Sequence, residues 1–152
     1  MSMALKIALI HPEIPPNTGN IARLCVATNC ELHLVKPLGF SISDKHLKRA
    51  GLDYWQYLKL FVHDSLELFL NDLYGNFYFF STKGKVPYTK ISFSEDDWLI
   101  FGSETMGFPD LIFEKFGNKI YNIPMFGPVR CLNLSNSVAI VTYEALRQIK
   151  KF

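Results

Sequence analysis

The sequence predicts an α/β fold in which a mostly parallel sheet is flanked by helices. Three observations point to this class. First, short apolar runs typical of strands alternate along the whole chain with segments of helical periodicity. Second, the 152 residues allow one substantial core and contain neither an internal repeat nor a linker, so we expect a single domain over residues 1–152. Third, Gly, Asn, Ser and Thr gather in the loops that follow the strands, where open parallel sheets bind ligands.

The first half of the chain is expected to contain three strands and three helices. Lys6–Ile10 is a short apolar run typical of a buried strand. The prolines of the stretch 11–20 indicate irregular structure, and the apolar positions after it predict a helix from about Asn20 to Thr28. The remaining elements of this half are strands at Leu32–Val35 and Leu60–Val62, a basic helix at Asp44–Ala50, and a helix from Ser65 to about Leu73 that Asp64 or Ser65 caps.

The second half continues the alternation and ends in an unusual helix. Its expected strands are Asn76–Phe80, Trp98–Phe101 and Lys119–Ile123, and a short helix begins near Asp110. The last helix, which reaches Ile149, has two neighbouring apolar stripes, one of Val138, Val141, Ala145 and Ile149 and one of Ala139, Tyr143 and Leu146. A surface helix of a small monomer needs only one such stripe. The second is therefore covered either by the same domain or by another copy of the chain.

The composition argues against several classes of protein. No apolar run approaches the ~20 residues that span a bilayer, and the first residues lack the apolar segment of a secretion signal, so we expect a cytoplasmic protein with no membrane partner. The three cysteines, Cys25, Cys30 and Cys131, show no zinc-ligand spacing, and the four histidines are scattered. We therefore expect reduced thiols and no metal. The net charge of +2 does not by itself indicate a nucleic-acid-binding protein, but local clusters of basic residues can still form an RNA site.

The loops that follow the strands contain none of the common nucleotide or hydrolase signatures. The sequence has no GxGxxG after its first strand, no GxxxxGK[ST] and no GxSxG. Gly102, Gly107 and Gly127 instead leave the main chain of these loops accessible. This edge of the sheet suits a ligand that is held by backbone groups and apolar walls.

Two groups of residues are candidates for binding an anionic partner. Arg23 lies one turn from a helix N-terminus and away from the apolar face of its helix, so it either binds an anion there or is simply solvated. The segment 45–57 combines a basic run, which includes Lys48 and Arg49, with three aromatic residues. Such a segment could bind phosphates and stack on unpaired bases. The alternative is a solvated helix followed by aromatic residues of the core.

Five groups of short motifs, in a specific order and spacing, resemble a known family. They are PPNTGNIAR from Pro15, LGF from Leu38 with RAGLDY from Arg49, TKG from Thr82, FGSETMGFP from Phe101, and IPM from Ile123 with RCLNLSN from Arg130. Together they resemble the SPOUT superfamily of methyltransferases, and within it the small TrmL-type (YibK-like) enzymes. These enzymes methylate the 2'-oxygen of the ribose of the wobble nucleotide, a cytidine or modified uridine at position 34 of tRNA. The resemblance extends from Ile7 to about Gln148.

The resemblance implies a fold, a cofactor and a set of site residues. It implies a C-terminal trefoil knot, an obligate homodimer, and S-adenosylmethionine bound in the knot as the methyl donor. The matching positions that would bind this cofactor are Phe80, Gly102, Ile123, Cys131 and Leu132. Arg23 would act at the target ribose, and the residues that would contact the anticodon region of tRNA are Asn17, Lys48, Arg49 and Tyr143.

The motifs also depart from the family at several positions and leave two alternatives open. Cys131 stands where the family commonly has Ser, and Met106 stands where it often has Arg. One alternative is a 2'-O-methyltransferase for another RNA site, and the other is a non-catalytic knotted dimer that binds RNA. If the protein is an enzyme, we expect Arg23 to bind a phosphate and polarise the 2'-hydroxyl. It is not expected to act as a base, because a guanidinium stays protonated and cannot accept another proton. Glu104 is expected to bond loop amides, with proton acceptance as its alternative role.

Overall fold

The structure, a computed structural model, describes residues 4–45, 47, 49 and 54–152. Within this part of the chain, seven strands form one sheet in the order β3-β2-β1-β6-β4-β7-β5, and every neighbouring pair is parallel. The strands are β1 (Lys6–Ile10), β2 (Glu31–Val35), β3 (Lys59–His63), β4 (Phe77–Phe80), β5 (Val86–Pro87), β6 (Trp98–Phe101) and β7 (Ile120–Asn122). The predicted α/β class with a parallel sheet is confirmed.

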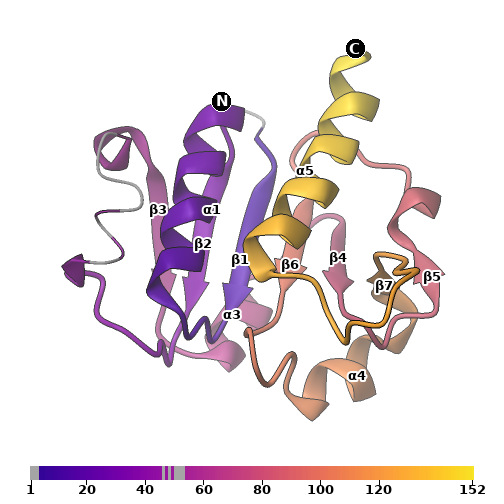
Figure 1. The fold of residues 1–152 in the computed structure, drawn as a ribbon, viewed down its shortest axis with the longest axis horizontal. Helices are drawn as coiled ribbons and strands as arrows, with labels where there is room; N and C mark the ends of the chain where they lie inside the picture. Colours follow the sequence, from indigo (N-terminus) through magenta and orange to yellow (C-terminus); the bar gives the residue numbers. More distant parts are fainter. Residues whose placement is uncertain (1–3, 46, 48, 50–53) are drawn as a thin grey trace.

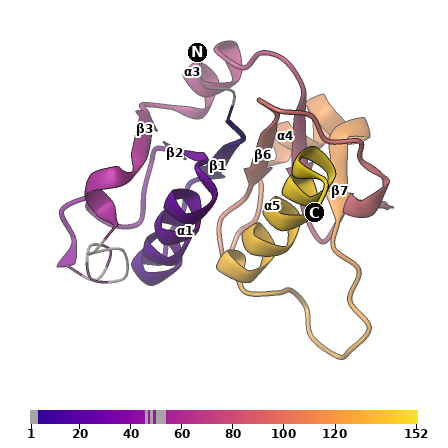
Figure 2. The ribbon, with the colours of Figure 1, turned by 90° about the horizontal axis from the view of Figure 1, so that it is seen from above.

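Helices cover both faces of this sheet (Figures 1 and 2). The helices α1 (Pro15–Thr28) and α5 (Leu134–Lys150) lie side by side on one face, and α3 (Leu66–Asn71) and α4 (Asp110–Phe116) cover the other. Short 3-10 turns, η1 (Trp55–Tyr57), η2 (Tyr88–Lys90) and η3 (Gly117–Lys119), complete the connections. Because successive side chains of a strand point to opposite faces, Ile7 and Leu9 of β1 pack toward α1 and α5, while Ala8 and Ile10 pack toward α3.

The structure corrects the predicted start of the first helix. The stretch before Asn20 is not irregular throughout, because α1 already begins at Pro15. Proline is compatible with the first turn, where the missing N–H groups would have no partner within the helix. The cap predicted for α3 is confirmed at Ser65, whose Oγ accepts a hydrogen bond from the backbone N–H of Leu68 at 3.1 Å. The basic helix predicted at 44–50 lies partly outside the described residues.

The segment that joins β4 and β5 packs closely against the end of β7. β7 lies between β4 and β5, so the segment 81–85 that joins those two strands passes the carboxyl end of β7. The packing there is tight: Ser81 N donates to the carbonyl of Tyr121 at 2.9 Å, and the side-chain amide of Asn122 donates to the carbonyl of Gly84 at 2.6 Å. A Cβ on Gly84 would lie 2.5 Å from the carbonyl carbon of Tyr121. The trefoil knot itself stays a prediction.

The two apolar stripes of α5 differ in burial. Val138, Val141 and Ala145 of the first stripe are fully buried against the sheet and α1. On the second stripe Tyr143 is 47% exposed, and its neighbour Ile140 is 37% exposed. The same domain therefore leaves part of the second stripe uncovered.

No helix formed by residues 4–45, 47, 49 and 54–152 is both long enough and apolar enough to cross a membrane.

Candidate functional site

A cavity of about 700 Å³ opens at the carboxyl ends of β4, β6 and β7. Its walls are the loops that follow these three strands, together with the first turns of α1 and α5. This is the edge of the sheet at which the sequence predicts binding, and the volume lies in the range of pockets that hold small-molecule ligands.

All five positions predicted to bind a cofactor lie in the wall of this cavity. They are Phe80, Gly102, Ile123, Cys131 and Leu132. These residues come from three loops that are far apart in the sequence, and parallel strand pairing brings the loops to one edge. Phe80 and Phe101 from adjacent strands stack with their ring centroids 5.0 Å apart and add an apolar surface. That these residues contact a cofactor stays a prediction.

Glu104 joins the loop after β6 to the start of α1. One of its carboxylate oxygens accepts a hydrogen bond from Glu13 N at 2.8 Å, and the other accepts from Ile14 N at 2.8 Å. In return, Glu13 accepts hydrogen bonds from the hydroxyl of Thr105 at 2.7 Å and from its backbone N–H at 3.3 Å. Hydrogen bonds from Thr105 and Ser103 hold the pKa of Glu13 below its ordinary value. The expected bonding of Glu104 to loop amides is therefore present.

Asn17 extends this connection to the third wall of the cavity. Its Nδ2 donates to Glu104 at 3.3 Å, and its Oδ1 accepts from the side-chain amide of Asn133 at 3.1 Å. Asn133 in turn caps α5, because its Oδ1 accepts from the backbone N–H of Ser135 at 2.9 Å. Asn17, predicted as an RNA contact, is only 8% exposed. Both ends of its amide are thus used inside the protein.

The loop after β6 approaches itself closely at Gly102. Ser103 and Gly107 exchange two backbone hydrogen bonds of 3.1 Å, and Gly107 adopts a left-handed φ of 67°. A Cβ at Gly102 would lie 2.6 Å from the carbonyl carbon of Gly107. Because real side chains do not come this close to a backbone, position 102 requires glycine to keep this shape of the wall.

The other predicted residues do not lie at the cavity. Arg23, Arg49 and Tyr143 are exposed and absent from its wall, and Lys48 lies outside the described residues. Arg23 follows Asn17 by six residues along α1, which places it about 9 Å farther along the helix axis and about 120° around it. Its guanidinium carbon lies 5.1 Å from the centre of the Tyr54 ring. Within a single chain, Arg23 therefore lies away from the cavity.

Sequence reasoning did not identify several residues of the wall. Lys83 and Arg130 bring positive charge to it, and Lys83 Nζ lies 5.0 Å from the centre of the Phe113 ring. Both basic residues belong to the motifs quoted for the resemblance, which was the available signal. Phe113 of α4 and Ser137 of α5 carry no such signal, because their helical spacing reports burial and not proximity to a ligand. In the described part of the chain, no three His, Cys, Asp or Glu side chains gather as a metal site.

Comparisons with known proteins agree on one family. The sequence model described as the SpoU rRNA Methylase family matches residues 4–143. A protein of Methylovorus glucosotrophus (strain SIP3-4) named tRNA (cytidine(34)-2'-O)-methyltransferase is 51% identical over 144 residues, which cover 93% of this chain and 94% of that protein. A Yersinia pestis protein of the same name is 43% identical over 152 residues, which cover 95% of this chain and 94% of that protein. A solved structure described as "Structural insights into the 2-OH methylation of C/U34 on tRNA" superimposes with a TM-score of 0.92 at 43% identity, with 99% of each chain covered.

Proposed function

This chain belongs to the SpoU rRNA methylase family, and on that basis we propose that it methylates the ribose 2'-oxygen of the wobble nucleotide of tRNA. The methyl donor is S-adenosylmethionine, and the target is cytidine or a modified uridine at position 34. The observation that carries the proposal is the similarity to relatives named tRNA (cytidine(34)-2'-O)-methyltransferase, which extends over more than nine-tenths of both chains. The cavity at the carboxyl ends of β4, β6 and β7 supplies a place for the donor.

The residues of the cavity fit S-adenosylmethionine. Phe80, Ile123 and Leu132 offer apolar surface, and the turn at Gly102 offers main-chain donors and acceptors beside it. Bound there, the cofactor would supply a methyl group that its sulfonium centre has already activated, so that no metal is required. The task left to the protein is to place the ribose oxygen in line with that methyl group, and positioning of this kind can account for much of the rate.

Arg23 is our candidate for presenting the ribose. A guanidinium stays protonated at neutral pH, so it can donate hydrogen bonds but cannot remove the proton of the hydroxyl. Its planar set of N–H donors suits a phosphate beside the target nucleotide together with the 2'-oxygen. In the transfer, the bond from the methyl carbon to sulfur would break as the bond to the ribose oxygen forms, sulfur would leave as a neutral thioether, and the hydroxyl proton would go to water.

We propose a homodimer in which Arg23 of one protomer serves the cavity of its partner. Two observations support it. Arg23 lies outside the cavity of its own chain, and α5 keeps Tyr143 of the second stripe and the neighbouring Ile140 partly exposed. A second copy that covers this stripe would also bury apolar surface that the single chain leaves in water.

The substrate assignment is tested by mapping. Purified protein is incubated with S-adenosylmethionine and with tRNA from cells that lack the gene, and ribose methylation is mapped along each tRNA. We expect new methylation at position 34 alone. Methylation at another nucleotide would favour the enzyme for a different RNA site. Binding of both ligands without transfer would favour the non-catalytic RNA-binding dimer.

The shared site is tested with hybrid dimers. Arg23→Ala should abolish transfer and leave cofactor binding nearly intact, and Gly102→Val should abolish cofactor binding. When the two variants are co-expressed with different tags, purified hybrid dimers should regain about half of the wild-type activity, because one of their two sites is complete. Inactive hybrids would place Arg23 and the donor in the same chain, and an active Arg23→Ala protein would remove Arg23 from the mechanism.

We also propose that the protein is cytoplasmic, where it would encounter tRNA, and that it has a surface that binds the anticodon region. We place this surface near the segment 45–57, where Arg49 is exposed. Tyr143, exposed on α5, lies either at this surface or at the dimer contact. Replacing Arg49 with Ala is expected to weaken tRNA binding and to reduce its salt dependence, which filter-binding titrations over a range of salt concentrations would measure.

A further inference from the structure

The guanidinium of Arg23 lies against an aromatic ring. Its central carbon is 5.1 Å from the centre of the Tyr54 ring. Among the residues that the structure describes, no carboxylate forms an ion pair with Arg23. Arg23 is thus an exposed cation, and no acidic side chain in the described part of the chain forms an ion pair that would offset its charge.

The ring of Tyr54 belongs to a well-anchored turn. Tyr54 directly precedes η1, and its carbonyl accepts a hydrogen bond from the backbone N–H of Tyr57 at 3.0 Å. The next residue, Trp55, packs against the core between the sheet and α1. The ring is therefore attached to the body of the protein at a point that faces Arg23.

A ring and a carboxylate would have opposite effects on the donors of Arg23. The attraction of a cation to a ring face uses the positive charge as a whole and leaves the N–H groups able to bond elsewhere. A carboxylate would accept two of these N–H groups and would compete with a phosphate for them. A ring can thus restrict the rotamers of the arginine while its donors remain available to an anionic substrate.

We propose that Tyr54 is a positioning residue that holds the Arg23 guanidinium in the orientation in which it receives the RNA. This inference rests on the proposed role of Arg23 in the transfer reaction. Tyr54 acts through Arg23 and does not itself contact the reacting atoms. The opposing explanation is that the ring of Tyr54 stacks directly on a base of the tRNA.

Three substitutions separate the ring from the hydroxyl and from general damage. Tyr54→Leu should lower kcat about five- to tenfold with the KM for S-adenosylmethionine unchanged, and Tyr54→Phe should stay within about twofold of the wild type, because it keeps the ring face. The matched control is Tyr74→Leu, which removes the ring that lies 5.5 Å from Lys6 Nζ, and neither Tyr74 nor Lys6 lines the cavity. This control should keep the wild-type kcat.

A double-mutant cycle on tRNA affinity tests whether Tyr54 acts through Arg23. Tyr54→Leu should weaken tRNA binding in the wild type and have no further effect in the Arg23→Ala background. An equal loss in both backgrounds would show direct stacking on RNA and overturn the proposal. Loss of activity in Tyr54→Phe, or full activity in Tyr54→Leu, would overturn it as well. If Tyr54→Leu does not fold, as judged by thermal unfolding, Tyr54→Gln replaces it in the same comparison.

The activities of Arg23→Ala and Tyr54→Leu also distinguish failure of this inference from failure of the proposed function. An Arg23→Ala protein with wild-type turnover would refute the role of Arg23 itself. An inactive Arg23→Ala protein beside a fully active Tyr54→Leu protein would refute only the role of Tyr54.

Discussion

Gly102 shows at the scale of one residue how the cavity keeps its shape. The absence of a side chain lets the loop after β6 fold back until the backbone of Gly107 occupies the place of a Cβ. Gly127, in the loop before α5, has open space in the same position. The two glycines therefore differ in what a methyl group would meet.

Gly102→Ala is expected to weaken binding of S-adenosylmethionine at least about tenfold. The added methyl group must displace Gly107, and overpacking of this kind costs about 1–3 kcal/mol. Isothermal titration with the cofactor measures the effect, and Gly127→Ala serves as the matched control with wild-type affinity. Equal affinities in the two variants would contradict the importance of this close approach.

At the scale of elements, the start of α5 is tied to the other walls of the cavity through Asn133. Its Oδ1 accepts hydrogen bonds from Ser135 N and from Asn136 N, which are two of the unpaired donors of the first helical turn. Its Nδ2 donates to Asn17, which reaches Glu104. One side chain thus caps a helix with its oxygen and positions that helix with its nitrogen.

Replacing Asn133 separates these two contributions. Asn133→Asp keeps an acceptor for the cap and loses the donor to Asn17, whereas Asn133→Ala loses both. We expect Ala to lower the free energy of unfolding by about 1–2 kcal/mol and Asp to lower it less, because a carboxylate also suits a helix N-terminus. Urea titration checks this order, and a greater loss in the Asp variant would be evidence against the cap.

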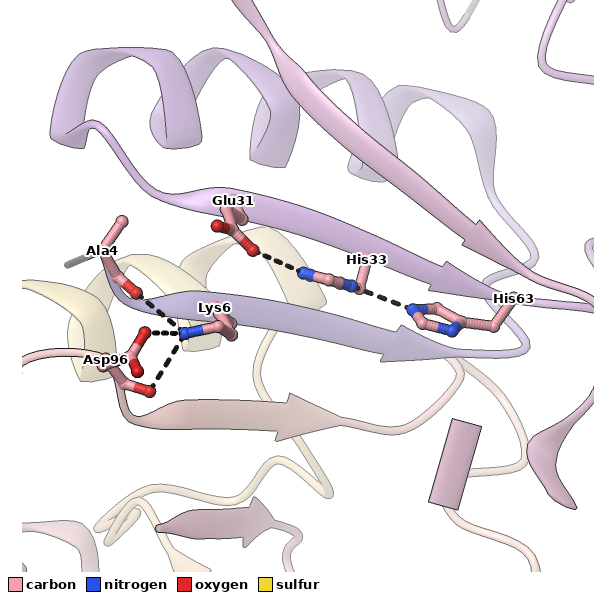
Figure 3. A network of polar contacts seen from close by, with 6 residues as sticks. All are labelled: Ala4, Lys6, Glu31, His33, His63 and Asp96. Atoms are coloured by element: carbon pink, nitrogen blue, oxygen red, sulfur yellow. Dashed lines mark hydrogen bonds and ion pairs between the residues drawn. The ribbon is translucent and has the colours of Figure 1, made fainter. Parts of the chain in front are cut away.

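At the scale of the whole molecule, two neighbouring groups of polar side chains, centred on the buried Lys6 and His33, lie on the face of the sheet that α3 covers (Figure 3). Lys6, 3% exposed, donates to the carbonyls of Ala4 and Asp96 and forms an ion pair with the Asp96 carboxylate. Beside it, His33 Nε2 lies 2.9 Å from Glu31, and His33 Nδ1 lies 2.9 Å from His63 Nε2.

Glu31 determines which ring nitrogens of His33 and His63 carry a hydrogen. The Glu31 carboxylate only accepts, so His33 Nε2 carries the hydrogen and Nδ1 accepts from His63 Nε2. Burial lowers the pKa of His33 from 6.5 to about 4, although Glu31 acts in the opposite direction. Burial also lowers the pKa of His63. Both rings are therefore neutral in the folded protein at neutral pH.

These shifts predict that acid destabilises the fold in a defined range. The unfolded chain protonates His33 near pH 6.5, but the folded protein does so only near pH 4. The unfolded state binds more protons between these values, so His33 alone should reduce stability by about 3 kcal/mol as the pH falls from 6.5 to 4. Urea titrations at several pH values measure this slope. His33→Gln should flatten it, and an unchanged slope would contradict the assignment.

The sequence by itself determined the elements whose signals are local. The buried strands at Lys6–Ile10 and Trp98–Phe101 and the cap at Ser65 agree with the structure, because hydrophobic runs and capping residues act within a few positions. The start of α1 at Pro15 was missed, because a proline is read as a helix breaker unless its place in the first turn is known. The motifs also identified five residues of the cavity wall, Phe80, Gly102, Ile123, Cys131 and Leu132.

Only the tertiary structure decided which of these residues come together. Asn17 and Asn133 are 116 positions apart, and their contact depends on the placement of β1, β6 and β7 in one sheet. The same placement separates Arg23 from the cavity of its own chain and sets it against Tyr54. Periodicity records which side of an element is buried but not which distant element covers it, so pairings over such distances arise only when the sheet assembles.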